Sequence, residues 1–190
     1  MTRPTDAFAN AVSSGAEAIR AAANDPADQV RLLSAVASYS PPTVPGTSPI
    51  SQHLALVVAA TAALCRRFAL TSLARACADY VPTSHDDAVS LRTAVAALFD
   101  AEVTVAGDAG SSACYLALRS LRTAVVADLT TRGSRLPNLV TVTRRAAEPA
   151  LVLAHKLYQD ATRTDELVAG AGTDVPHPAF MPTTFTALGS

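Results

Sequence analysis

The stretch SQHLALVVAATAALCRRFALTSLARACADY, residues 51–80, decides the fold of this chain. Alanine and leucine dominate it, no proline interrupts it, and Ser51 can cap its first turn, so it predicts one long α-helix. The first half of the stretch is apolar on nearly every side. A helix that is apolar all round is expected to be buried all round. We therefore expect residues 51–80 to be the central helix of a mainly helical core.

Two further helices follow it closely. Ser84 and Asp87 have the spacing of a capping box before a helix that runs to about Val105. Ser111 can cap the next helix, which Gly133 would end. The apolar residues of that helix recur at helical spacing: Cys114, Leu118, Leu121, Val125 and Leu129. Because both connections are short, the three helices should run antiparallel, as an up-down-up bundle over residues 50–136.

The chain before this bundle reads as two shorter helices over residues 1–39. They are followed by a proline-rich linker over residues 40–49, in which four prolines disfavour both helix and sheet. A linker of this kind should let the N-terminal helical segment move independently of the bundle.

The pattern changes after Pro137. Residues 139–143 are mostly β-branched and predict a strand. Pro149 opens a helix that ends near Tyr158, with Leu151, His155 and Tyr158 expected on its packed side. A second short helix over 161–168, a loop over 174–178 and a closing strand over 184–188 complete the order strand–helix–helix–strand. The fold class is therefore mainly α, with a small C-terminal α/β module over residues 137–190.

Composition excludes several classes of function. The formal net charge is −1 and the basic residues are scattered, so the chain lacks the clustered basic face that favours a nucleic-acid partner. The most apolar run, residues 54–65, falls short of the ~20 residues that cross a bilayer, which predicts no membrane span. Alanine buries little surface, so a core this rich in alanine favours a homo-oligomer that buries more between its copies.

The candidate chemical groups have structural interpretations. His85, Asp86 and Asp87 could form a metal or acid–base cluster, but a helix start favours acidic caps. His155 could be a base in a cleft, although its spacing favours a packed ring. The three cysteines have no metal spacing, and Cys114 lies in no nucleophile motif. The sequence therefore predicts no enzyme, no metal site and no cofactor.

The C-terminal module resembles a LysM-like domain. The resemblance rests on the strand, on a helix ending at residues 158–160, on a second helix containing residues 165–168, and on the run HPAFMP at 177–182. LysM sequences carry an Asn after the second helix and Pro-Gly in the last turn, where this chain has residues 169–172 and 181–184. We therefore expect weak peptidoglycan binding or none.

A longer resemblance covers roughly residues 50–190. Residues 66–95, 116–135 and the run ALVLAHKLYQD at 150–160, with HPAF at 177–180, resemble the C-terminal part of the "DNA circularization" proteins of Mu-like phages, which are baseplate hub components. Members of that family are longer and begin with a further domain.

The resemblance implies a structural protein of the virion. It would lie at the junction of baseplate hub and tail tube in a contractile phage tail, assembled in the host cytoplasm, and would act through protein–protein contacts in a ring. Its partners would be other tail proteins, contacted by Tyr158, Asp160, His177 and Phe180. The alternatives are a LysM-type peptidoglycan-binding protein and a cytoplasmic helical adaptor.

Overall fold

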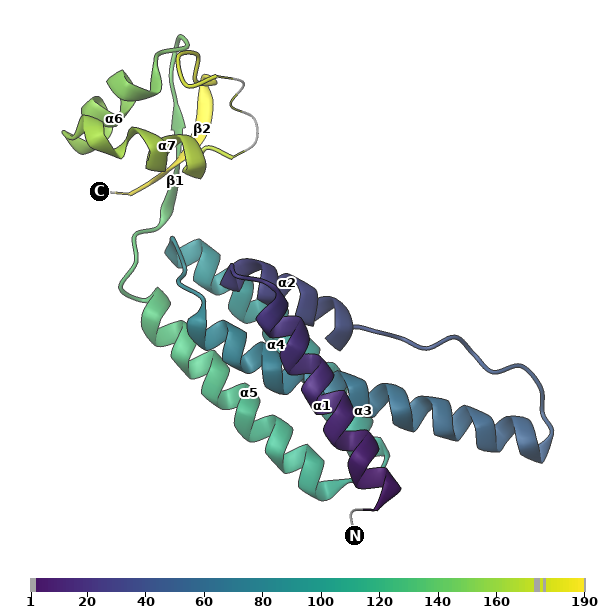
Figure 1. Cartoon of the computed structure of the whole chain (residues 1–190). Helices are drawn as coiled ribbons and strands as arrows, with labels where there is room; N and C mark the ends of the chain where they lie inside the picture. The colour runs from purple at the N-terminus through teal and green to yellow at the C-terminus, as the bar shows by residue number, and fades with distance from the viewer. Residues whose placement is uncertain (1–2, 173–174, 176, 190) are drawn as a thin grey trace. The chain divides into compact units, whose positions relative to one another are not determined.

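The computed structural model describes residues 3–172, 175 and 177–189, and it is mainly helical with a small two-stranded antiparallel sheet (Figure 1). The predicted loop over 174–178 lies partly outside these residues. The chain forms two compact units. Unit 1 comprises residues 1–81 and 90–131, and unit 2 comprises residues 82–89 and 132–190.

Within the described residues, five helices precede the sheet and two lie between its strands. They are α1 (Pro4–Ala22), α2 (Pro26–Ala37), α3 (Pro49–Asp79), α4 (His85–Asp108), α5 (Ser112–Gly133), α6 (Ala150–Tyr158) and α7 (Thr164–Gly170). A 3-10 turn at Ala161–Arg163 precedes α7, and the strands are β1 (Leu139–Thr143) and β2 (Thr184–Leu188). Both strands lie where the sequence predicts them.

Local signals set the helix starts. Asp25 caps α2 by accepting a hydrogen bond from the Ala27 amide, 2.9 Å away, with Pro26 in the first turn. The long helix α3 begins at Pro49, earlier than predicted. The hydroxyl of Ser48, not that of Ser51, is the cap: it accepts from the Ser51 amide at 3.2 Å.

The core of unit 1 draws on all five helices. Its largest fully buried side chains include Leu33 of α2, Leu70 of α3, Phe99 of α4 and Leu129 of α5, while Ile19 of α1 packs against them. The expectation that the N-terminal helices move independently is therefore wrong, because α2 contributes Leu33 to the shared core. The linker is long enough to let the chain fold back on α3.

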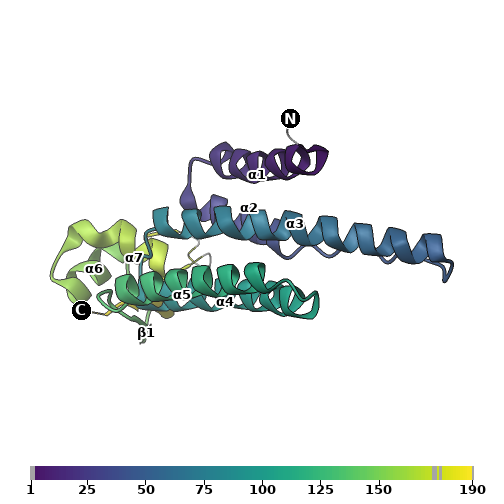
Figure 2. The ribbon, with the colours of Figure 1, turned by 90° about the horizontal axis from the view of Figure 1, so that it is seen from below.

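Side-chain pairs give the direction of α4 against α5. Arg92 of α4 donates to Thr130 of α5 at 3.1 Å, and Arg122 of α5 donates to Asp100 of α4 at 2.8 Å. Since the later residue of α4 meets the earlier residue of α5, these helices are antiparallel. Seen from below, α3 lies between α1 and the pair of α4 and α5 (Figure 2).

The first half of α3 is not buried, which corrects the expectation for an all-round apolar helix. Ala62 is the first buried residue of α3, and the residues before it extend past the other helices of unit 1 (Figures 1 and 2). Periodicity shows which residues need a partner, but it does not show whether the same chain supplies one.

Unit 2 is a strand pair covered by two helices. β1 and β2 are antiparallel, with Val142 opposite Phe185. The core contains Leu153, Leu167, Met181 and Phe185. The predicted packed side of α6 is wrong in part: Leu151 and His155 are exposed, and the buried residues of α6 are Ala150, Leu153 and Ala154.

Candidate functional site

Tyr158, the first predicted partner-binding residue, is engaged within unit 2. Its hydroxyl accepts a hydrogen bond from the Leu188 amide at 3.1 Å, which ties the end of α6 to β2. The guanidinium of Arg163 lies 3.9 Å from the centre of its ring, a close cation–π contact. Burial raises the pKa of the Tyr158 hydroxyl above its ordinary value. One face of the ring is therefore covered by Arg163 and cannot serve as an open stacking platform.

Asp160, the second predicted residue, caps the 3-10 turn. Its carboxylate accepts from the hydroxyl of Thr162 at 2.7 Å and from the Thr162 amide at 2.8 Å. These hydrogen bonds hold the pKa of Asp160 below its ordinary value. The side chain thus has a local structural role.

His177 and Phe180 form an exposed turn. The Phe180 amide donates to the His177 carbonyl at 2.9 Å, and the Ala179 amide donates to Nδ1 of the His177 ring at 3.0 Å. The two rings lie 6.3 Å apart, and Phe180 is 68% exposed. Phe180 is the predicted residue that offers the most free apolar surface.

The four predicted residues do not come together in one site. Tyr158 and Asp160 lie at the C-terminal end of α6, whereas the turn of His177 and Phe180 lies at its N-terminal end. That second position is fixed by the Ala150 amide, which donates to the Pro178 carbonyl at 2.7 Å. The two pairs are therefore separated by the length of α6, about 13 Å at 1.5 Å per residue.

The cluster of His85, Asp86 and Asp87 is structural. The Asp87 amide donates to the Ser84 hydroxyl at 3.0 Å, while the Asp87 carboxylate accepts from the Thr83 amide at 3.0 Å. Asp86 accepts from the Leu139 amide at 2.6 Å, and Nδ1 of His85 lies 3.1 Å from the carbonyl of Gly133. Each side chain meets a backbone group of unit 2. In the described part of the chain, no three metal-ligating side chains are grouped.

Glu102 is a buried carboxylate that the sequence does not single out. It is 2% exposed, and its two oxygens accept from Nε of Arg66 at 2.7 Å and from Nε of Arg67 at 2.8 Å. Arg66 also donates to the Tyr39 carbonyl at 3.2 Å. The network joins α3 and α4 to the end of α2. Both arginines are engaged in this network.

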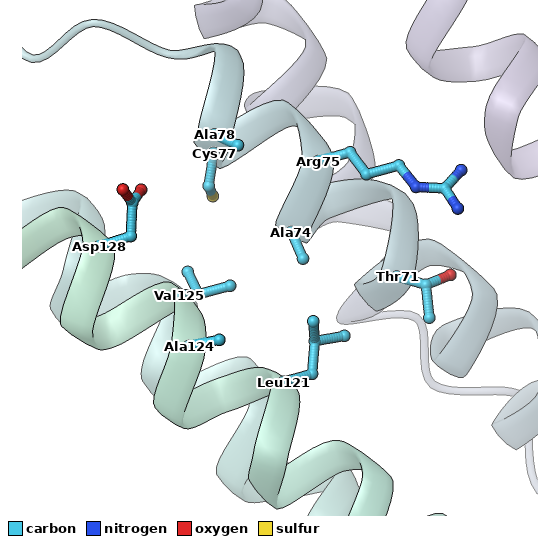
Figure 3. Close-up of a pocket in the computed structure, with 9 residues that line it drawn as sticks. All are labelled: Thr71, Ala74, Arg75, Cys77, Ala78, Leu121, Ala124, Val125 and Asp128. Carbon is cyan, nitrogen blue, oxygen red and sulfur yellow. The ribbon is translucent and has the colours of Figure 1, made fainter.

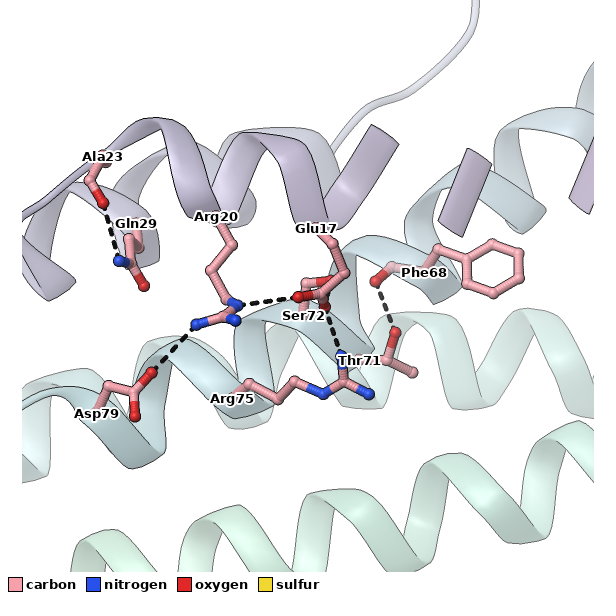
Figure 4. A network of polar contacts seen from close by, with 9 residues as sticks. All are labelled: Glu17, Arg20, Ala23, Gln29, Phe68, Thr71, Ser72, Arg75 and Asp79. Carbon is pink, nitrogen blue, oxygen red and sulfur yellow. Dashed lines mark hydrogen bonds and ion pairs between the residues drawn. The ribbon is translucent and has the colours of Figure 1, made fainter. Parts of the chain in front are cut away.

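A second polar network holds α1 on α3 (Figure 4). One oxygen of Glu17 accepts from the hydroxyl of Ser72 at 2.6 Å and from Arg75 at 2.7 Å. Arg20 donates to the other oxygen of Glu17 at 3.0 Å and to Asp79 at 3.2 Å. The charged groups of this face thus neutralise one another.

An apolar hollow of about 460 Å³ lies between α3 and α5 (Figure 3). Ala74 and Cys77 of α3 face Leu121 and Val125 of α5 across it, while Arg75 points away. The Cys77 side chain is buried. The lining is mostly apolar, and its hydroxyl and charged side chains are those of Thr71, Arg75 and Asp128.

The exposed segment of α3, residues 49–61, is the feature that the sequence analysis missed. Ile50 is 82% exposed, Leu54 50%, Leu56 69% and Val57 48%. No Asp, Glu, Lys or Arg occurs between Pro49 and Cys65. Such a concentration of exposed apolar side chains on a folded protein indicates an interaction surface.

By length and composition alone, α3 could cross a membrane, and it is the one helix of the described residues for which this holds. Core helices of soluble proteins also meet this criterion. The apolar run considered in the sequence, residues 54–65, is shorter than the folded helix, which spans 31 residues from Pro49 to Asp79. The absence of a membrane span therefore stays a prediction.

Comparison with models of known protein families gives no match for this chain, and comparison with curated proteins gives none either.

Proposed function

We propose that this protein is a structural component of a contractile phage tail, at the junction of baseplate hub and tail tube, where it acts through protein–protein contacts in a ring. The exposed segment of α3 carries the first part of this proposal, because a large uncharged apolar surface needs a partner. The place in a phage tail rests on the resemblance of residues 50–190.

The polar groups favour a structural role over catalysis. His85, Asp86 and Asp87 meet backbone groups, and Glu102 is neutralised by two arginines. A catalytic site instead needs a nucleophile or base that is held near a substrate pocket and is free to react.

The finer architecture belongs to the same proposal. We interpret α3, α4 and α5 as an up-down-up bundle and β1, α6, α7 and β2 as a LysM-like module. In the tail, the module would dock on a neighbouring protein through the turn of His177 and Phe180, which offers the exposed aromatic ring that interfaces favour.

The test is the content of the particle. Contractile tails should be purified on a density gradient from cells that make the protein, and their proteins measured by mass spectrometry. We expect the chain at a fixed ratio to the tail-tube protein, in both intact tails and isolated baseplates. A chain found only in the soluble cytosol would contradict the proposal and favour a cytoplasmic helical adaptor.

A LysM-type peptidoglycan-binding protein is the second candidate, favoured by the strand–helix–helix–strand order of unit 2. We expect little binding, because Arg163 covers one face of the Tyr158 ring. Sedimentation with insoluble peptidoglycan measures this. Saturable binding that is lost in both Tyr158→Ala and Phe180→Ala, but kept in Leu151→Ala, would favour the second candidate.

A further inference from the structure

The exposed segment of α3 carries a line of side chains on one side. Ile50, Leu54, Val57 and Thr61 follow one another at spacings of four, three and four residues, which places them on one face at 3.6 residues per turn. This is the a/d spacing of a coiled coil, with Leu54 at an a position and Ile50 and Val57 at d positions. We call these four residues the α3 seam.

We infer that the α3 seam binds the α3 seams of further copies of this chain, in a bundle of at least three copies. The inference deepens the proposed function, since it rests on a ring of copies and names the surface that would hold the ring together. It extends that function because nothing in the resemblance assigns this segment a role.

Charge favours a second copy as the occupant. The segment has no Asp, Glu, Lys or Arg, and the next charged residues, Arg66 and Arg67, are both paired with Glu102. A charged partner surface would lose its hydration here without gaining an opposite charge. The same segment of another copy brings no charge to the contact and matches it in apolar character.

The available area favours more than two copies. The segment is about 20 Å long at 1.5 Å per residue, so one side of this helix offers on the order of 400 Å². A stable interface between two partners buries about 800 Å² on each. One seam contact would thus hold two copies weakly, whereas a helix in a larger bundle makes such a contact with each of two neighbours.

The residue types favour the same outcome. Leucine at a with isoleucine at d shifts the preference of coiled coils toward trimers and tetramers. Leu54 at a, with the β-branched Ile50 and Val57 at d, follows this pattern, whereas the second a position holds Thr61. The seam is short, so its contribution depends on the several contacts that a closed ring provides at once.

A bilayer fits the segment less well. The exposed part of α3 is about 20 Å long, whereas the hydrocarbon core of a membrane is about 30 Å thick. The missing length would have to come from residues after Thr61, which begin with the buried Ala62 and Ala63 and continue to the ion pairs of Arg66 and Arg67 with Glu102. Insertion would therefore unpack the core of unit 1.

The test compares two leucines of the same segment. Leu54 lies in the seam, whereas Leu56 lies roughly 130° around the helix from its centre and is at least as exposed. Leu54→Arg and Leu56→Arg therefore add the same charge to the same helix, the first inside the proposed contact between copies and the second outside it. The full chain and both variants would be studied by analytical ultracentrifugation at micromolar concentration, with circular dichroism as the check on folding.

We expect the unchanged chain and Leu56→Arg to sediment as trimers or larger oligomers and Leu54→Arg to sediment as a monomer with unchanged helicity. Val57→Arg, a second seam variant, should behave as Leu54→Arg does. The proposal that the seam binds further copies would be refuted by any of three results: the unchanged chain is a monomer, all variants stay oligomeric, or Leu54→Arg and Leu56→Arg dissociate the oligomer equally.

Flotation with phosphatidylcholine and phosphatidylglycerol vesicles provides the membrane comparison. We expect the unchanged chain to stay in the unbound fraction. Co-flotation that Leu54→Arg and Leu56→Arg both abolish would overturn the proposal in favour of a membrane. The proposed function is tested separately: a chain that enters tails but is monomeric in solution would refute the seam and leave the tail role standing.

Discussion

At the scale of single residues, Gly133 allows the end of α5 to approach the start of α4. A Cβ at this position would lie 2.6 Å from the Cβ of Ala88, which is buried. We expect Gly133→Ala to destabilise the protein by about 1–3 kcal/mol, since overpacking outweighs the better helix propensity of alanine. Chemical denaturation followed by circular dichroism measures the change.

Gly15 provides the matched control. It lies inside α1, and a Cβ there would meet no atom within 4 Å. Gly15→Ala should therefore stabilise the protein by up to about 1 kcal/mol through helix propensity alone. If both glycine variants were stabilised alike, the close approach at Gly133 would be refuted.

Glu102 gives a second prediction at this scale. Glu102→Ala removes the only carboxylate that the structure shows paired with Arg66 and Arg67, and leaves two like charges side by side. We expect a loss of about 3–5 kcal/mol, the cost of breaking a buried ion pair. Thermal and urea unfolding of the variant would measure it.

Asp100, two residues earlier in the same helix, is the control for Glu102. It pairs with Arg122; the Asp100 side chain is 55% exposed and the Arg122 side chain 34%. Asp100→Ala should cost about 0–1 kcal/mol, as for most surface ion pairs. Similar losses for the two variants would mean that the burial of Glu102 has no energetic effect.

The cap at the start of α4 could be predicted from the sequence, whereas the cap of α3 was assigned to Ser51 in place of Ser48 and the role of Glu102 was not predicted. Ser84 and Asp87 act through neighbours three or four positions away, so their spacing alone indicates a cap. Glu102 meets Arg66 and Arg67 from about 35 positions away, and along the chain it reads as an ordinary surface charge. Pairing across helices depends on their packing, which a residue pattern does not specify.

At the scale of elements, the docking of α1 on α3 should depend on pH. The hydrogen bond from Ser72, with the nearby Arg20 and Arg75, holds the pKa of Glu17 below its ordinary value of 4.5. A carboxylate with a lowered pKa in the folded state stabilises the fold above its unfolded pKa. This stability is lost as the pH falls below about 4.5 and through the folded pKa.

We therefore expect Glu17→Gln to be less stable than the unchanged chain at pH 7 and to lose less stability between pH 5 and pH 3. Ser72→Ala should also reduce this acid dependence, because it removes the largest cause of the lowered pKa of Glu17. The reduction should be smaller than for Glu17→Gln, since Arg20 and Arg75 still lower that pKa. Urea unfolding across that pH range measures both. Parallel pH profiles for all three proteins would contradict the role of Glu17.

The elements themselves were predicted unevenly. β1 was found because its run of β-branched residues is a local signal, and α3 was found because its apolar stretch is too long for a strand. The predicted packed side of α6 was wrong at Leu151 and His155. A helix of nine residues contains too few apolar positions to define its buried face from their spacing. The exposure of Ile50 and Leu54 could not be predicted, because it depends on where the other helices end.

At the scale of the whole molecule, we predict that unit 1 survives without most of unit 2. Among the residues that the structure describes, none after Leu129 belongs to the core of unit 1. Deletion of residues 139–190 should therefore leave a helical protein that unfolds cooperatively, while the first turn of α4 loses the hydrogen bond from Leu139 to Asp86. Circular dichroism and thermal unfolding measure the first result.

The same deletion should prevent incorporation into tails, because it removes the turn of His177 and Phe180 that we propose to dock. Complementation with tagged full-length and truncated proteins, followed by purification of particles, makes the comparison. Normal particles that contain the truncated protein would show that the docking surface lies elsewhere.

Unit 2 is built from two separate pieces of chain, and this affects the order of events during synthesis. Asp86 accepts its hydrogen bond from Leu139, which is 53 positions later in the chain. At a synthesis rate of 5–20 residues per second, Leu139 is added about 3–10 s after Asp86. By then every residue of unit 1 has been translated. The helical core can therefore fold on the ribosome before unit 2 folds. The nascent chain would then expose the α3 seam before the proposed docking turn of His177 and Phe180 has been synthesised.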